Sequence, residues 1–145
     1  MNDIAVNGAK VISREQIMLL EDAMRTLPQI DFTAYTKHHF APGVYVRELF
    51  MPEGTMAVGK IHRFEAMNIL VSGTVRITTD DGIQDLTGPQ IFNSRPGTKK
   101  AALALTDVIL LNVHHTHLTD VDAIEQEVIA PNFEALAADE QEKLT

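Results

Sequence analysis

Short segments of strand-forming residues, separated by turn signals, fill the chain from residue 44 to residue 113. Glycine, proline and aspartate stand at the joins, as in Asp80-Asp81-Gly82 and Gly88-Pro89, where a turn needs a positive or a fixed φ. No join is long enough for the helical crossover that parallel strands require. The pattern therefore predicts an all-β jelly-roll barrel. Its eight predicted strands cover residues 44–51, 55–61, 67–71, 74–79, 83–86, 90–93, 101–105 and 108–113.

A helix is predicted ahead of the β region. Ser13 followed by Gln16 has the form of a capping box, and apolar residues then recur at helical spacing until Pro28. We therefore expect an amphipathic helix over about 14–27, whose apolar stripe packs against the barrel or a second subunit.

A helical tail is predicted after the last strand. Thr119 with Asp122 has the form of a second helix cap, and Pro131 ends the short helix that follows. The stretch 133–144 is either helical or frayed. The chain thus divides into an N-terminal arm (1–40), a barrel (41–118) and a C-terminal helical tail (119–145).

Composition limits the partners and the compartment. With 145 residues and 45% hydrophobic content, the chain supports one core. A formal charge of −8 disfavours nucleic acid and anionic membranes, and the lack of cysteine excludes disulfides and thiolate chemistry. The start, Met1–Lys10, has no long apolar region, and no segment is apolar enough to span a bilayer. We expect a cytoplasmic protein that binds neither nucleic acid nor membrane.

Two segments resemble conserved motifs of the cupin superfamily. Residues 54–73, GTMAVGKIHRFEAMNILVSG, are similar to the first motif, and residues 88–100, with Pro96-Gly97, are similar to the second. The resemblance implies a cupin-type jelly-roll β-barrel and, by analogy, a homodimer. More narrowly, the chain resembles small cupin-like proteins of tailed bacteriophages and bacteria, a group without an assigned function. This narrower resemblance is carried by Gly59-Lys60-Ile61-His62, Asn68-Ile69-Leu70, Pro96-Gly97-Thr98-Lys99 and His114.

The metal positions of the family are mostly lost. In metal-binding cupins the first motif supplies two histidines and a glutamate, and the second supplies another histidine. When both motifs are aligned, these places fall on Lys60, His62, Ala66 and Lys100. Only His62 is a competent ligand, because an ammonium has no lone pair to give and alanine has no donor atom. The resemblance therefore implies a barrel without a metal cofactor.

Strand periodicity supplies the first candidates for a binding pocket. On the predicted strand 55–61 and its extension, Met56, Val58, Lys60 and His62 share one face, and the cupin register turns that face inward. Lys60 and His62 are either solvated at an open mouth or anchor an anionic or carbonyl-bearing ligand.

Further candidates come from the later strands. Asn68 lies on a strand, where asparagine is disfavoured, and Lys100 belongs to a positive group with Arg95 and Lys99. His114 follows an apolar run and matches the phage proteins. The predicted ligand-binding set is Lys60, His62, Asn68, Lys100 and His114.

The remaining histidines are given no role. His115 and His117 are expected at an exposed strand end, and His38 and His39 in a loop before the barrel. Glu48 shares a strand face with Val44, Val46 and Phe50; if that face is inward, Glu48 can pair with Lys60 or Arg76.

Three functions remain open at this point. The first is metal-independent binding of a small polar, anionic molecule, which in a phage would mean sequestering or modifying a host metabolite in the host cytoplasm. The second is a metal-dependent enzyme of the isomerase or dioxygenase kind, with iron, manganese or zinc at His62, Glu65 and His114. The third is a structural or interaction module. No nucleophile elbow, P-loop or dinucleotide fingerprint occurs, and the sequence does not decide whether any reaction is catalysed.

Overall fold

The computed structural model describes residues 12–144, so the prediction for Met1–Lys10 lies outside it. The strands are β1 (Thr36–Ala41), β2 (Val44–Met51), β3 (Met56–Val58), β4 (Ile61–His62), β5 (Ala66–Ser72), β6 (Thr74–Thr79), β7 (Gly82–Thr87), β8 (Gln90–Ser94), β9 (Ala101–Ala104), β10 (Val108–His115) and β11 (Ile129–Ala130). The helices are α1 (Arg14–Met24), the 3-10 helix η2 (Phe32–Tyr35), α2 (Val121–Val128) and α3 (Phe133–Leu144).

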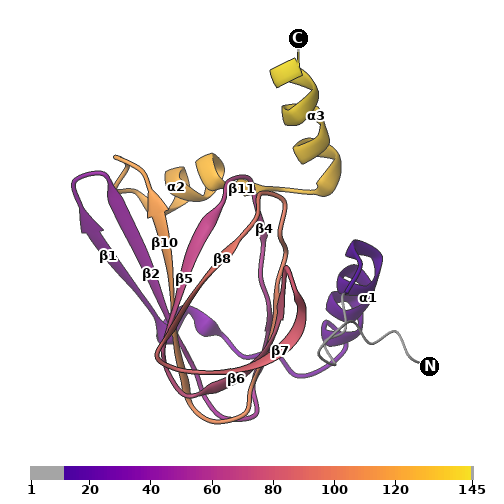
Figure 1. Cartoon of the computed structure of the whole chain (residues 1–145), viewed down its shortest axis with the longest axis vertical. Coiled ribbons are helices and arrows are strands. Elements are labelled where there is room, and N and C mark those ends of the chain that lie inside the picture. The colour runs from indigo at the N-terminus through magenta and orange to yellow at the C-terminus, as the bar shows by residue number, and fades with distance from the viewer. Residues whose placement is uncertain (1–11, 145) are drawn as a thin grey trace.

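Two antiparallel sheets face each other and form the barrel (Figure 1). One has five strands in the order β1-β2-β10-β5-β8, and the other has four in the order β3-β9-β6-β7. A short pair, β11 with β4, lies where the helical tail meets the barrel. The predicted all-β jelly-roll architecture, with an N-terminal helix and short C-terminal helices, is confirmed.

The core lies between the two sheets, where apolar side chains from both meet. Met51 and Leu70 of the larger sheet pack with Val75 and Ile77 of the smaller one, and all four are at most 1% exposed. Burial of each such side chain stabilises the folded chain by about 1.5–3 kcal/mol. This core fills one part of the barrel and leaves the other for polar side chains.

The strand β1 corrects the prediction that His38 and His39 lie in a loop. It pairs with β2 from Thr36 to Ala41, and Gly43 in the connecting turn has a φ of +79°. The sheet therefore begins inside the segment that was predicted as an arm. The sequence signal was weak because lysine and two histidines occupy the centre of this strand.

A break at Gly59 corrects the prediction of one continuous strand over 55–61. The chain leaves the ladder between β3 and β4, and the Gly59 N–H donates to the Lys100 carbonyl at 2.8 Å. Before the break, Ala57 packs against the core while Met56 is 37% exposed. The prediction that Met56 faces the interior is therefore wrong, because the break shifts which residues point inward.

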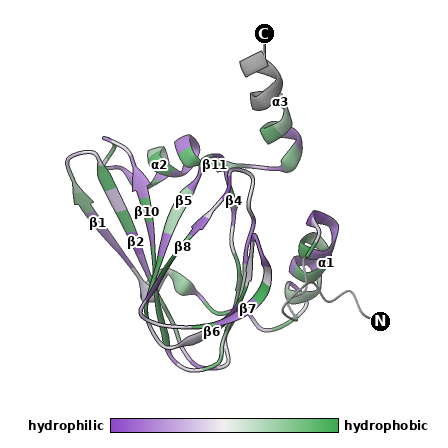
Figure 2. Ribbon diagram, viewed as in Figure 1, coloured by the Kyte–Doolittle hydropathy of each residue, from purple (hydrophilic) through white to green (hydrophobic). Residues whose placement is uncertain are grey.

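The helix α1 has the capping box that the sequence predicts. Ser13 accepts from the Gln16 N–H, and the Gln16 side chain accepts from the Ser13 N–H. Figure 2 shows hydrophobic and hydrophilic residues mixed along the helix. Ile17 is its buried residue, and Lys99 reaches Glu21 at 3.2 Å, so an ion pair fastens the helix to the barrel.

The tail begins one residue later than its predicted cap. Asp120, rather than Thr119, accepts from the Ala123 N–H at 3.1 Å and starts α2. The stretch after Pro131 is helical. Within residues 12–144, no helix combines the length and the apolar character needed to cross a bilayer.

Candidate functional site

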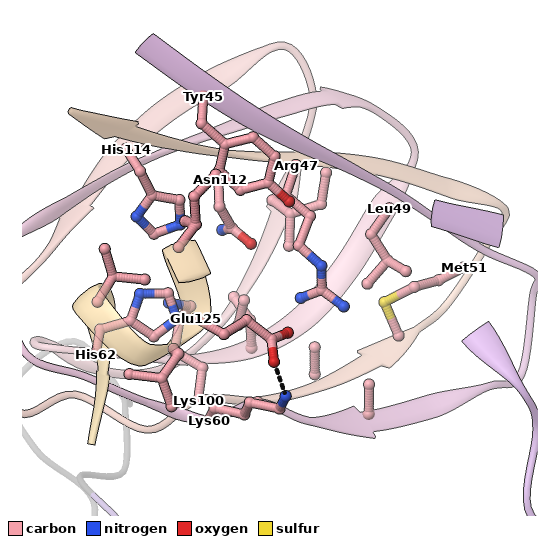
Figure 3. A pocket seen from close by; sticks show the side chains of 18 residues that line it. Tyr45, Arg47, Leu49, Met51, Lys60, His62, Lys100, Asn112, His114 and Glu125 are labelled. Atoms are coloured by element: carbon pink, nitrogen blue, oxygen red, sulfur yellow. Dashed lines mark hydrogen bonds and ion pairs between the residues drawn. The ribbon is translucent and has the colours of Figure 1, made fainter. Parts of the chain in front are cut away.

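A pocket of about 90 Å³ lies inside the barrel, between the two sheets and beneath α2. Its polar lining comes from β2, β10, the β3–β4 region, the residue before β9, and α2 (Figure 3). Apolar side chains, among them Leu49, Met51 and Ile77, form the remaining wall. The size suits a small molecule and not a polymer. The polar lining residues are Tyr45, Arg47, Lys60, His62, Lys100, Asn112, His114 and Glu125.

The pocket carries more positive than negative charge. Lys60 forms an ion pair with Glu125 at 3.0 Å, and both side chains are largely solvated. Arg47 and Lys100 also line the pocket, and neither pairs with a carboxylate of residues 12–138, the part of the chain whose side chains the structure describes. A local excess of cations can attract an anion even in an acidic protein.

Burial makes the charge on Lys100 costly. Removal from water lowers the pKa of its ammonium to about 8, against the opposing influence of Asp80. Its Nζ atom lies 3.3 Å from Ser94 Oγ. The ammonium is therefore directed into the barrel, where its hydrogen-bond partner among the described residues is a hydroxyl, and an anion in the pocket would stabilise it.

The rings of His62 and His114 stack inside the pocket with centroids 5.4 Å apart. Burial, together with the charges of Lys100 and Arg47, lowers the pKa of His62 to about 3 and also lowers the pKa of His114. Both imidazoles are neutral at physiological pH as a result. The Nδ1 atom of His62 is buried and has no hydrogen-bond partner within the described chain, which marks a polar group open to a ligand.

Tyr45 extends this stack toward the surface. Its ring lies 5.9 Å from that of His114, and its hydroxyl is 2.7 Å from His38 Nδ1. Burial raises the pKa of the Tyr45 hydroxyl. His38 thus contacts a pocket residue, although no role was predicted for it from the sequence.

Tyr45 and Arg47 are pocket residues that sequence reasoning missed. The strand β2 carries apolar and charged residues on both faces, so alternation alone does not identify the inward face. Glu48 lies on the outward face, where His39 Nε2 meets its Oε1 atom at 2.8 Å. It therefore pairs with neither Lys60 nor Arg76.

Asn68 lies behind the pocket and does not line it. It is fully buried, donates to the Phe92 carbonyl at 3.1 Å and to Ser94 Oγ at 2.9 Å, and accepts from Asn112 at 2.7 Å. Asn112 and Lys100 are pocket residues, and both connect to this network. Asn68 thus positions the side chains that a ligand would meet.

The other predicted cations and histidines point elsewhere. Lys99 pairs with Glu21 on α1, and Arg95 lies 3.7 Å from Asp80 on the outside. The positive group predicted around Pro96-Gly97 is therefore divided, and Lys100 alone reaches the pocket. His115 and His117 are exposed, as the sequence predicts.

The residues present do not fit the metal that the cupin fold implies. Glu65 is exposed and accepts from Asn93 at 3.2 Å, so it does not join His62 and His114. Across the part of the chain that the structure describes, no three histidine, cysteine, aspartate or glutamate side chains gather as a metal site. The other positions that the resemblance to cupin motifs assigns to metal ligands hold Lys60, Ala66 and Lys100, none of which is a histidine or a carboxylate.

Comparisons with known proteins support the fold. No family model and no curated protein sequence matches the chain. The chain is similar to the structure of KdgF from Halomonas sp., with 15% identity over 66% of this chain and 91% of that chain and a TM-score of 0.51. It is also similar to an RmlC-like cupin from Shewanella frigidimarina, with 18% identity over 67% and 96% of the two chains and a TM-score of 0.45. The predicted cupin-type jelly-roll fold is confirmed by the arrangement of the two antiparallel sheets and by the likeness to KdgF, and an identity this low concerns the fold alone.

Proposed function

We propose that the chain binds a small organic anion, of the carboxylate class, in the barrel pocket and without a metal ion. The observation that carries this proposal is the presence of Arg47 and Lys100 in one pocket, neither paired with a carboxylate of the described residues. Both residues are half-buried, and a partly desolvated cation without a counterion is unfavourable, so a bound anion would stabilise them.

The surrounding residues suit the rest of such a ligand. Arg47 offers a planar fork of N–H donors that matches a carboxylate, while Lys100 offers a point charge. Asn112 and the neutral His62 can hydrogen-bond to further oxygen atoms. Apolar residues such as Leu110 and Ile124 would contact the carbon skeleton. The mixture favours a short carboxylate over inorganic phosphate.

The two alternative functions have less support. A metal-dependent isomerase or dioxygenase would need a third ligand beside His62 and His114, and Glu65 lies outside the pocket. A purely structural module would be expected to fill its barrel with apolar side chains, whereas this one devotes eight polar residues to a cavity. If the chain is encoded by a phage, the proposed ligand is a host metabolite, sequestered or modified in the host cytoplasm.

Calorimetry with matched ligands tests the anion site. We expect short carboxylates to bind and their neutral amides not to bind. Arg47→Met and Lys100→Met should each weaken binding at least about tenfold, since a hydrogen bond to a charged group contributes about 1.5–3 kcal/mol. Arg95→Met, which removes an exposed cation outside the pocket, should leave binding unchanged.

A chelator separates this proposal from the metal-dependent alternative. EDTA should not change carboxylate binding, because no metal takes part in it. Loss of binding in EDTA, restored by iron, manganese or zinc, would overturn the metal-independent reading. Equal binding of amides and carboxylates would overturn the anion site itself.

We further expect a homodimer that buries the outer face of the five-stranded sheet. The strands β5, β8 and β10 contain no aspartate, glutamate, lysine or arginine. On this face Met67 is 44%, Val71 40% and Ile91 65% exposed. Neutral apolar faces of this kind are self-complementary under a two-fold axis.

Light scattering of purified variants tests the dimer. The wild-type chain should have the mass of two chains, and Ile91→Glu or Val71→Glu should reduce it to one, because each places a charge in the apolar contact. Leu19→Glu, on the exposed side of α1, is the matched control and should remain dimeric. A monomeric wild-type chain, or dissociation by Leu19→Glu alone, would contradict this interface.

A further inference from the structure

We infer that the Lys100 amine forms a reversible imine with a small oxo acid, whose carboxylate Arg47 holds in the same pocket. This inference rests on the proposed anion site and adds a carbonyl group to its ligand. It also assigns the pocket a covalent step that requires no metal.

The placement of Lys100 is the first argument. Its side chain lines a small cavity, its Nζ atom lies 3.3 Å from Ser94 Oγ, and it forms no ion pair with a carboxylate among residues 12–138. An amine attacks a carbonyl only in its neutral form, and an adjacent carboxylate would hold it as an ammonium. Burial supports the neutral form, because it lowers the pKa of Lys100 to about 8. Near pH 7.5 roughly a quarter of such amines are unprotonated.

The contrast with Lys60 makes the assignment specific. Lys60 lines the same pocket, but its Nζ atom pairs with Glu125 at 3.0 Å and 60% of its side chain is exposed. Its side chain is thus paired with a carboxylate and open to water. The two lysines of the pocket therefore differ in their surroundings. Lys100, without a carboxylate partner, is the better placed of the two to act as a nucleophile.

The neighbouring residues suit the proton movements of imine formation. The neutral amine attacks the carbonyl carbon, and a C–N bond forms in a carbinolamine. Loss of the former carbonyl oxygen as water, with the two amine hydrogens, leaves the imine, and hydrolysis reverses the reaction. His62 is neutral, lies within the electrostatic influence of Lys100, and has a buried Nδ1 atom without a partner. Its imidazole can hydrogen-bond to the carbinolamine oxygen and position it, while solvent water carries the proton from the amine to the leaving oxygen.

The charge of Arg47 selects among carbonyl compounds. This charge lowers the pKa of both His62 and His114, as the charge of Lys100 does, so both cations lie near the same pair of rings. A ligand that presents a carboxylate to Arg47 can present a carbonyl to Lys100. A short 2-oxo acid offers a carboxylate to Arg47 and a carbonyl to the Lys100 amine, whereas a simple ketone offers the carbonyl alone.

Reductive trapping with pyruvate as the probe tests the inference. The full chain is incubated with pyruvate and cyanoborohydride, and intact mass and peptide mapping locate the adduct. We expect one adduct, on Lys100, with loss of at least 90% of it in Lys100→Arg. Lys99→Arg is the matched control and should keep the adduct, because Lys99 pairs with Glu21 and does not line the pocket. Arg47→Met should lower trapping of pyruvate about tenfold or more and leave trapping of acetone nearly unchanged.

Binding of propionate, which has no carbonyl, separates the possible failures. Propionate binding without a pyruvate adduct, or an adduct on Lys60 instead, would overturn the imine and leave the anion site standing. Absence of both propionate binding and an adduct would overturn the inference together with the proposed function. Propionate binding by Lys100→Arg would show that this variant is folded, so that its lost adduct reports on the amine.

Discussion

Gly73→Ala should abolish stable folding of this chain. Gly73 connects β5 to β6 with a φ of +88°, and a Cβ there would lie 2.0 Å from the Asp107 carbonyl oxygen and 3.0 Å from Thr106 Oγ1. The backbone cannot easily yield, because the Gly88 N–H donates to the Gly73 carbonyl and the Thr74 N–H donates to Thr106. We expect the free energy of unfolding to fall by more than about 4 kcal/mol, measured by urea denaturation.

Gly54→Ala is the matched control for this prediction. Gly54 has nearly the same conformation, with a φ of +86°, yet nothing lies within 4 Å of the Cβ that alanine would add. Only the intrinsic strain of a left-handed residue remains, at a cost of about 1–2 kcal/mol. If both variants lose the same stability, backbone conformation and not the close approach to Asp107 determines the effect.

The second large effect is acid sensitivity that originates at His62. Its pKa is about 3 in the folded chain and 6.5 in the unfolded chain, so the unfolded state binds more protons between these values. The stability that the neutral His62 contributes is therefore fully present above pH 6.5 and is lost as the pH falls toward 3. At pH 5 we expect the free energy of unfolding to be about 2 kcal/mol lower because of this residue alone. Burial, Lys100, His114 and Arg47 all act in this direction.

Urea denaturation of paired variants between pH 7.5 and pH 5 measures this contribution. His62→Gln should flatten the pH dependence by about 2 kcal/mol relative to the wild type, because glutamine does not titrate. His115→Gln removes an exposed histidine at the end of β10 and should keep the wild-type slope. Carboxylates elsewhere contribute equally to every variant. An unchanged slope in His62→Gln would mean that His62 is not held neutral by its surroundings.

The predicted strands agree closely with the structure wherever local signals are strong. The strands over 44–51 and 74–79 have the predicted bounds, and the turns at Gly54 and Gly97 have the positive φ expected of glycine. The capping box at Ser13 forms as its spacing indicates. Each of these features depends on residues within a few positions of one another, so the sequence contains the information directly.

The candidate site was only partly predictable. Strand periodicity in the cupin register placed Lys60 and His62 in a pocket, and Lys100 and His114 were added from their neighbours and the narrower resemblance; all four line the cavity. Arg47, on which the proposal depends most, was missed because both faces of its strand mix apolar and charged residues.

The sequence by itself determined the strand and turn pattern, the helix caps and the charge, since all of these follow from residue type and short spacing. Only the tertiary structure decided which face of β2 points inward, where the strand breaks at Gly59, and why Lys99 and Lys100 diverge. Those outcomes depend on partners distant in the chain: β10 for β2, the Lys100 carbonyl for Gly59, and Glu21 for Lys99. A side chain's direction on a strand changes with a single residue of register, and long-range pairing sets the register.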